Sequence, residues 1–278
     1  MNQYRILIQA PDTTGLIYKA AKVFFENNLN IISNHEFVDN EQNLFFMRSE
    51  VSGDTDAKRL RELLVSALPA EVEITIKLAR KKNIVLMVTK EAHVLGDLLI
   101  RYHEGQLDAN IVGVISNYNN LRPLCEHFNL PYYYISTENI SREEHEAKVL
   151  GTLEMFDSLD YIVLAKYMRI LSHDFTARYP NKILNIHHSF LPAFIGANPY
   201  KQAFARGVKI IGATAHFVNE NLDEGPIIQQ DIIHIDHAYD WQAMQQAGRD
   251  VEKVVLAGAL KLALEDRIFV NGNKTVIF

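Results

Sequence analysis

The alternation of short apolar runs with helical stretches after residue 83 is the feature that most restricts how this chain can fold. The runs are IVLMVT (84–89), NIVGVISN (110–117), YYYIS (132–136) and DYIVLAKY (160–167). Parallel strands have this continuous apolar character because helices cover their sheet on both faces. We therefore predict an α/β fold for this part, a Rossmann-like half with a mostly parallel sheet.

The first 80 residues follow a different pattern. Strand-like runs and amphipathic helical stretches succeed one another in the order strand, helix, strand, strand, helix, strand. This order predicts one small ferredoxin-like α+β domain, of βαββαβ topology. The charged cluster of Arg80, Lys81, Lys82 and Asn83 interrupts the pattern, and we interpret it as a solvated linker between a domain at 1–80 and a domain at 84–278.

The remainder of the second domain contains three more strand-like segments and one long helix. The segments are KILNIHH (182–188), IIGATAHFV (210–218) and PIIQQDIIHI (226–235), and the helix is expected from about Trp241 to Leu264. With 48% hydrophobic residues among 278, the chain can fill two separate cores.

Charge and cysteine content restrict the partners and the compartment. The formal net charge of −6 argues against a nucleic-acid or anionic-membrane surface, and no apolar stretch approaches the roughly 20 residues that span a bilayer. The single cysteine, Cys125, cannot form an intrachain disulfide, and the helical spacing of Leu121, Leu124 and Phe128 predicts that it is buried. We therefore expect a cytoplasmic protein whose partners are small molecules or further copies of itself, without nucleic acid or membrane.

Polar residues that can do chemistry concentrate between residues 185 and 230. Asn185 and His187 lie two apart at the end of an apolar run, so on a strand both side chains point to one face, as joint action on a carbonyl requires. Asp223 lies in a loop that Gly225 and Pro226 mark. Any one of these three residues alone is more often a turn residue or a satisfied hydrogen-bond partner.

Together, the Asn-x-His strand and the loop aspartate resemble the formyltetrahydrofolate-dependent formyltransferase and hydrolase family. The separation agrees, since 223 − 185 = 38. The segment LAKYMRILS is similar to the folate-facing segment of that family, which implies that Met168, Arg169, Ile170 and Leu171 lie near the pteridine. Ordinary packing remains an alternative, for Ile170 and Leu171 in particular.

The resemblance extends over residues 84–278, while residues 1–80 resemble an ACT regulatory domain, an arrangement shared with formyltetrahydrofolate deformylases. The resemblance implies 10-formyltetrahydrofolate as substrate and no prosthetic group. An ACT domain also implies a homo-oligomer, a dimer or tetramer, and an amino-acid effector bound near Asp12 to Gly15. Within the chain, those two residues are also explained by a strand-to-helix turn.

Two features favour water over an amine as the acceptor of the formyl group. TKEAHVLGDLL stands where transferases acting on a phosphorylated amine carry a Gly-rich phosphate loop, and His188 in NIHHS stands where transferases have proline. Because adjacent strand residues face opposite ways, we expect His187 and His188 not to share a metal, and the sequence has no HExxH helix. Val94, Asn198 and Lys201 depart from the deformylase pattern.

The resemblance implies a role for each residue of the site. An enzyme that hydrolyses a formamide must stabilise an oxyanion, activate water and protonate N10. We expect His187 and Asn185 to stabilise the oxyanion and Asp223 to accept the proton of water. His216 either orients Asp223 or is a satisfied core histidine, and His188 either supports the site or packs. His93 is expected to line the pocket. Gly196 is expected at a backbone position that needs a positive φ or a close approach of other atoms.

Two alternatives remain at this point. One is a formyltransferase to a non-phosphorylated amine, such as an amino sugar, which would use the same three residues. The other is a catalytically inactive folate or amino-acid sensor. Formate released with water as the sole acceptor separates hydrolysis from both.

Overall fold

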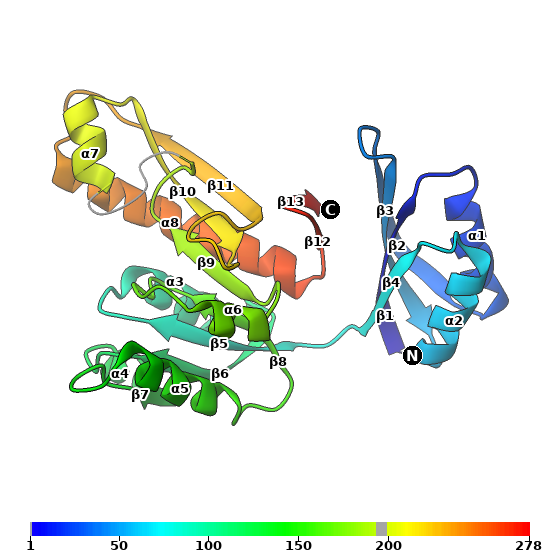
Figure 1. Ribbon diagram of the computed structural model, residues 1–278, viewed down its shortest axis with the longest axis horizontal. Coiled ribbons are helices and arrows are strands. Elements are labelled where there is room, and N and C mark those ends of the chain that lie inside the picture. The colour runs from blue at the N-terminus through cyan, green and yellow to red at the C-terminus, as the bar shows by residue number, and fades with distance from the viewer. Residues whose placement is uncertain (1, 193–198) are drawn as a thin grey trace. The chain divides into compact units, whose positions relative to one another are not determined.

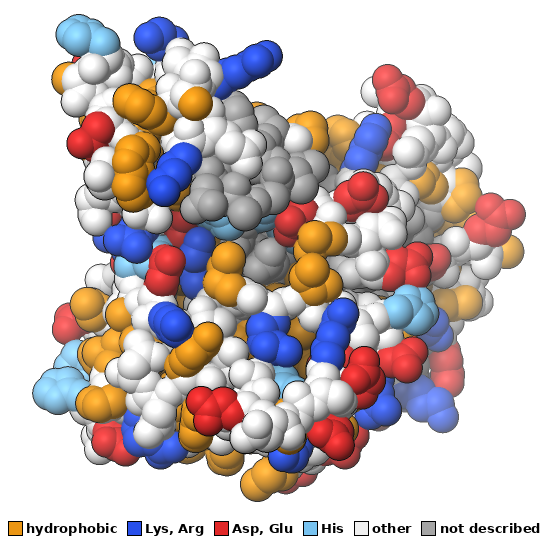
Figure 2. All heavy atoms as spheres, turned by 60° about the vertical axis from the view of Figure 1, so that its left-hand side comes forward, with side chains coloured by type: hydrophobic (Ala, Val, Ile, Leu, Met, Phe, Trp, Pro, Cys, Tyr) orange, Lys and Arg blue, Asp and Glu red, His pale blue; other side chains and the backbone are white. Residues whose placement is uncertain are grey.

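The structure is a computed structural model that describes residues 2–192 and 199–278, and it divides into two compact units (Figure 1). The first comprises residues 1–80, 266–269 and 276–278, and the second comprises residues 81–265 and 270–275. None of the helices in the described ranges combines the length and the apolar character that crossing a membrane requires. Figure 2 shows basic and acidic side chains interspersed on the face that it displays.

The first unit has the predicted βαββαβ order and fits a ferredoxin-like region. Its elements are β1 (Asn2–Pro11), α1 (Leu16–Glu26), β2 (Asn30–Asp39), β3 (Leu44–Gly53), α2 (Ala57–Ala67) and β4 (Glu73–Leu78). The strands form an antiparallel sheet in the order β2-β3-β1-β4. Alternate residues of β1, Ile6 and Ile8, pack with Phe24 of α1 and Leu64 of α2, because side chains alternate across a strand and one face meets both helices.

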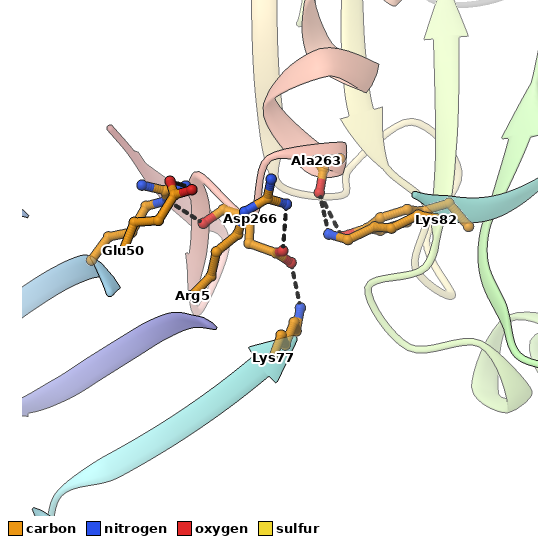
Figure 3. Close-up of polar contacts among 8 residues, drawn as sticks. Arg5, Glu50, Lys77, Lys82, Ala263 and Asp266 are labelled. Carbon is orange, nitrogen blue, oxygen red and sulfur yellow. Dashed lines mark hydrogen bonds and ion pairs between the residues drawn. The ribbon is translucent and has the colours of Figure 1, made fainter. Parts of the chain in front are cut away.

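The chain returns to the first unit after its longest helix. The Asp266 carboxylate, whose side chain is 1% exposed, contacts Arg5 at 3.3 Å and Lys77 at 2.7 Å, and its backbone oxygen accepts from Arg48 (Figure 3). β12 (Ile268–Asn271) and β13 (Lys274–Ile277) form a hairpin at the end of the chain. The compact units therefore differ from the expected division at 1–80 and 84–278, because this buried carboxylate and the residues beside it join the first core.

The second unit is built on a seven-stranded sheet in the order β11-β10-β9-β8-β5-β6-β7. Its strands are β5 (Lys82–Val88), β6 (Ala109–Ser116), β7 (Tyr132–Tyr134), β8 (Leu159–Leu164), β9 (Ile183–His187), β10 (Ile210–Phe217) and β11 (Ile227–His234). The five strands from β5 to β9 are parallel, and β10 and β11 continue the sheet antiparallel. This confirms the predicted α/β fold with a mostly parallel sheet.

Helices cover this sheet, and their side chains pack with those of the strands to form the core. They are α3 (His93–His103), α4 (Arg122–His127), α5 (Arg142–Leu153), α6 (His173–Arg178), α7 (Pro199–Arg206) and α8 (Trp241–Leu264). Val85 and Met87 of β5 pack with Val149 of α5 and Phe175 of α6, and α8 lies along β9, β10 and β11 (Figure 1). The bounds of α8 agree with the prediction, and Asp240 caps it by accepting a hydrogen bond from the Ala243 N–H at 2.8 Å.

Lys82 does not belong to a solvated linker, so that interpretation is wrong for this residue. It begins β5, is 5% exposed and donates through Nζ to the carbonyl oxygen of Ala263 at 2.9 Å. The ammonium also lies 5.3 Å from the ring centre of Tyr161. A lysine stem buries apolar surface, and the carbonyls of the last turn of α8 attract its charge.

Cys125 is fully buried, as predicted. Burial disfavours the thiolate and raises the pKa of this thiol to about 11. Cys125 is therefore a structural residue of the second unit.

The topology directs several loops to one edge of the sheet. After β5 the chain builds β6 and β7 on one side, then returns to place β8 and β9 on the other. The carboxyl ends of β5, β8 and β9 therefore lie at the same edge, beside the point where the strand order reverses, which is where open α/β sheets bind their ligands.

Candidate active site

A cavity of about 300 Å³ lies at this edge of the second unit. Three segments line it: the residues that end and follow β8, the end of β9, and the end of β10 with the loop after it. The predicted residues that line the cavity are Met168, Arg169, Ile170, Leu171, Asn185, His187, His188, His216 and Asp223. The structure thus brings together nine residues that the sequence spreads over 56 positions, from 168 to 223.

The strand register explains how the polar residues meet. β9 and β10 pair antiparallel, with His216 opposite Asn185 and Thr214 opposite His187. The Thr214 hydroxyl donates to the Ser189 carbonyl oxygen at 2.9 Å and accepts from the Leu191 N–H at 3.0 Å. The segment that follows β9 is therefore held to the neighbouring strand, β10.

His187 and Asp223 form the central contact of the site. Nδ1 of His187 lies 3.2 Å from Oδ2 of Asp223, and the two side chains are 8% and 12% exposed. Nε2 of His187 is buried and has no hydrogen-bond partner among the described residues. A proton on Nδ1 that is donated to Asp223 leaves Nε2 as the ring nitrogen available to a bound molecule.

The Asp223 carboxylate is held in its ionised form. Burial opposes ionisation, but the contacts with His187 and His216 outweigh it and lower the pKa of this carboxyl well below its usual range. Asp223 has a φ of 57°, in the left-handed region that aspartate tolerates better than most residues. Two residues on, a Cβ at Gly225 would overlap the carbonyl oxygen of Phe217, so only glycine lets this loop approach the strand so closely.

His216 is tied to both other polar groups. Its Nδ1 donates to the Phe217 carbonyl oxygen at 2.9 Å. Its Nε2 lies 3.2 Å from the side-chain amide of Asn185 and 3.7 Å from Oδ1 of Asp223. His216 is 1% exposed and contacts both the Asn185 amide and the Asp223 carboxylate.

His188 stacks on His187, with ring centres 5.1 Å apart and an angle of 28° between the rings. The expectation that adjacent histidines face opposite ways is wrong here, because β9 ends at His187 and alternation ends with it. Burial, followed by the charge of Lys166, lowers the pKa of His188 to about 4. No group of metal-binding side chains is found within residues 2–192 and 199–278.

The segment after β8 borders the cavity with exposed apolar side chains. Met168 and Ile170 are 60% and 59% exposed, although each is large and apolar. Leu171 also packs against the core of the second unit, so the packing alternative holds for it in part. Exposed apolar surface beside a cavity is typical of a ligand-binding site.

The remaining predicted residues lie elsewhere. His93 begins α3, bonds to Glu252 at 2.7 Å and is not among the residues that line the cavity. Asp12 and Gly15 precede α1 in the first unit, where Gly15 has a φ of 90°. Gly196 and Asn198 fall outside the described residues.

The sequence interpretation missed a buried charged cluster beside the cavity. It consists of Lys166, Glu252, His93 and Tyr200, and Lys166 also lines the cavity. One signal was present in the sequence, since Glu252 interrupts the apolar face that Val251, Val255 and Leu256 define on α8. A carboxylate on such a face needs a buried partner.

The fold and this cavity define an α/β protein of the formyltransferase type, and residues 82–260 match the Formyl transferase family. The chain is 53% identical over 272 residues to the formyltetrahydrofolate deformylase of Haemophilus influenzae, covering 98% of each, and 43% identical to that of Bacillus subtilis, covering 99% of this chain and 93% of the relative. The crystal structure of a formyltetrahydrofolate deformylase from Pseudomonas syringae superposes with a TM-score of 0.94 at 40% identity, covering 100% of this chain and 95% of that one. The chain belongs to the formyltetrahydrofolate deformylase family.

Proposed function

We propose that this protein hydrolyses 10-formyltetrahydrofolate to formate and tetrahydrofolate. The observation that carries the proposal is the His187–Asp223 pair, which leaves Nε2 of His187 without a described partner in the cavity that the Asn185 amide also lines. The relatives named above, of which this chain covers nearly the full length, support the same reaction.

In the proposed reaction, water attacks the formyl carbon and the bond from that carbon to N10 breaks. His187, donating through Nε2 when protonated, and the Asn185 amide stabilise the oxyanion, a contribution worth about 100- to 1,000-fold in rate per donor. Asp223 takes the proton of water, directly or through His187, and the proton is returned to N10 as tetrahydrofolate leaves. His216 keeps the Asn185 amide oriented, and His188 packs against the His187 ring.

The pteridine of the substrate is proposed to lie against the segment from Met168 to Leu171. The exposed side chains of Met168 and Ile170 supply apolar surface, and Arg169 lines the same cavity. Folate is then the small-molecule partner and the substrate, with no prosthetic group.

We also propose that residues 1–80 form an ACT regulatory domain and that residues 84–278 carry the catalysis in the cytoplasm. The ferredoxin-like sheet supports this, and its edge strand β2 exposes Ile31, Ile32 and Phe37, which a second copy of the chain would cover. An amino-acid effector is proposed near Asp12 and Gly15. A concentration-independent monomer in light scattering would refute the homo-oligomer, and identical kinetics across a panel of amino acids would refute the effector.

The test of hydrolysis is formate release from 10-formyltetrahydrofolate by the purified full chain, without any amine. We expect formate and tetrahydrofolate in equal amounts over many turnovers. Folate binding without formate would refute hydrolysis and favour the inactive sensor. Formate that is absent until an amine such as an amino sugar is added, with the formylated amine as product, would favour the transferase.

A further inference from the structure

The buried cluster beside the cavity is centred on the carboxylate of Glu252. Glu252 lies on α8 and is 1% exposed; its oxygens contact Nε2 of His93 at 2.7 Å, the hydroxyl of Tyr200 at 3.0 Å and Nζ of Lys166 at 3.3 Å. Burial opposes ionisation, but the contacts with His93 and Lys166 outweigh it and lower the pKa of Glu252 to about 2. The carboxylate is therefore charged, and Nζ of Lys166 lies 3.3 Å from it.

Lys166 belongs to the cluster and to the catalytic cavity at once. It follows β8, is 5% exposed and lines the cavity together with His187 and His188. Its φ of 66° lies in the left-handed region, which is unusual for a residue with a long side chain. Such conformations persist where the surroundings enforce them, and they concentrate at functional sites.

The neighbouring elements are shaped to keep this cluster closed. A Cβ at Gly248, one turn before Glu252 on α8, would overlap the hydroxyl of Tyr200. Glycine at this position therefore lets the hydroxyl reach the carboxylate, and Tyr200 also lies near His188, with ring centres 6.2 Å apart.

An amine that accepts a formyl group makes a specific demand on such a site. It arrives as an ammonium ion at neutral pH, so a buried acceptor position requires a carboxylate to pair with its charge. Among the described residues, two carboxylates with little exposure belong to or adjoin the cavity: Asp223, which contacts His187 and His216, and Glu252, which contacts Lys166. Glu220 also borders the cavity, but its side chain is 62% exposed and pairs with His173.

We propose that the Lys166 ammonium occupies, from within the chain, the position that an acceptor amine would take against Glu252, so that only water reaches the formyl carbon. The inference rests on the proposed hydrolysis and makes Lys166 the residue that determines acceptor specificity. Without its side chain, an external ammonium pairs with Glu252, releases one proton to solvent and attacks the formyl carbon as the free amine, whose nitrogen then gives up a second proton. The bond to N10 then breaks, N10 takes the proton, and a formamide leaves in place of formate.

The test compares Lys166→Ala with wild type and with Lys148→Ala, which removes an exposed lysine on α5. Alanine keeps a Cβ, so the backbone cost at φ 66° is unchanged while the side chain beyond Cβ is lost together with its amino group. Lys166→Gly, which also removes that cost, serves as the second variant should the alanine protein fail to fold. The probe is ethylammonium chloride, with sodium chloride of equal ionic strength as the control.

The first readout is thermal unfolding without folate. We expect ethylammonium to raise the melting temperature of Lys166→Ala or Lys166→Gly in a saturable manner, and to leave wild type and Lys148→Ala unchanged. Adding Glu252→Gln to the Lys166 variant should abolish the rise. A folded Lys166 variant with no saturable rise, or a rise that persists without the Glu252 carboxylate, would overturn the proposal.

The second readout is the products formed from 10-formyltetrahydrofolate in the presence of ethylamine, separated by mass spectrometry. We expect the ratio of N-ethylformamide to formate to be about tenfold or more higher in the Lys166 variant than in wild type. An equal ratio in the two proteins would overturn the proposal. Absence of formate from wild type would instead refute the proposed hydrolysis, while the thermal readout still decides whether an amine binds Glu252.

Discussion

Replacement of Asp223 by asparagine removes the charge of this carboxylate and little else. Asparagine has the same size, tolerates the φ of 57° as well as aspartate does, and can still accept the hydrogen bond that His187 donates across 3.2 Å. Because Asp223 is proposed to take the proton of water, we expect kcat to fall by about 100- to 10,000-fold. That range corresponds to about 3–5.5 kcal/mol of transition-state stabilisation.

The assay is formate release at saturating 10-formyltetrahydrofolate, which reports kcat separately from binding, with circular dichroism to establish folding. The matched control is Asp157→Asn, an exposed aspartate between α5 and β8, which should retain wild-type turnover. Turnover near that of wild type in folded Asp223→Asn protein would refute the role of this carboxylate as proton acceptor.

Three further predictions concern other parts of the structure. The pKa of His188 is about 4 in the folded protein and about 6.5 when unfolded, so wild type should lose up to about 3 kcal/mol of stability as pH falls from about 6.5 to 4, a slope that His188→Asn should lack in thermal melts. Gly225→Ala should displace the Asp223 loop and reduce formate release by about 100-fold, whereas Gly151→Ala, in open space on α5, should not; equal activities would contradict the close approach. Asp266→Asn should lower the free energy of unfolding by about 1–3 kcal/mol in urea titrations, because Arg5 and Lys77 lose their shared carboxylate; an unchanged unfolding curve would contradict this.

Much of the fold could be predicted because local patterns and tertiary burial agree in this chain. The apolar runs at 84–89 and 160–167 became β5 and β8 at the centre of the sheet, and the helix from Trp241 to Leu264 was predicted at both ends. Lys82 could not be predicted in this way. Its burial depends on a hydrogen bond to the Ala263 carbonyl oxygen, 181 positions away, and no local sequence pattern indicates that contact.

The arrangement of the site could be predicted where its residues lie on a strand. The prediction failed for the residue that follows the end of that strand. Asn185 and His187 share a face of β9, so their proximity follows from strand geometry. His188 lies one residue beyond the strand, where alternation no longer applies, and its ring turns onto His187 instead. The approach of Asp223 depends in turn on Gly225, whose requirement arises from a carbonyl group of the neighbouring strand.

The pairing of Lys166 with Glu252 shows why a site can be recognised before its specificity is understood. In the roles proposed for them, Asn185, His187 and Asp223 would serve any formyl transfer at this site, so they are equally compatible with water and with an amine as acceptor. In our proposal the acceptor is decided by what fills the neighbouring space, and that depends on Lys166 and Glu252, which lie 86 positions apart. In the sequence each of them looks like an exception within an apolar segment. The fold brings the two side chains to within 3.3 Å of each other, and Lys166 at the same time lines the cavity in which we propose that the formyl group is transferred.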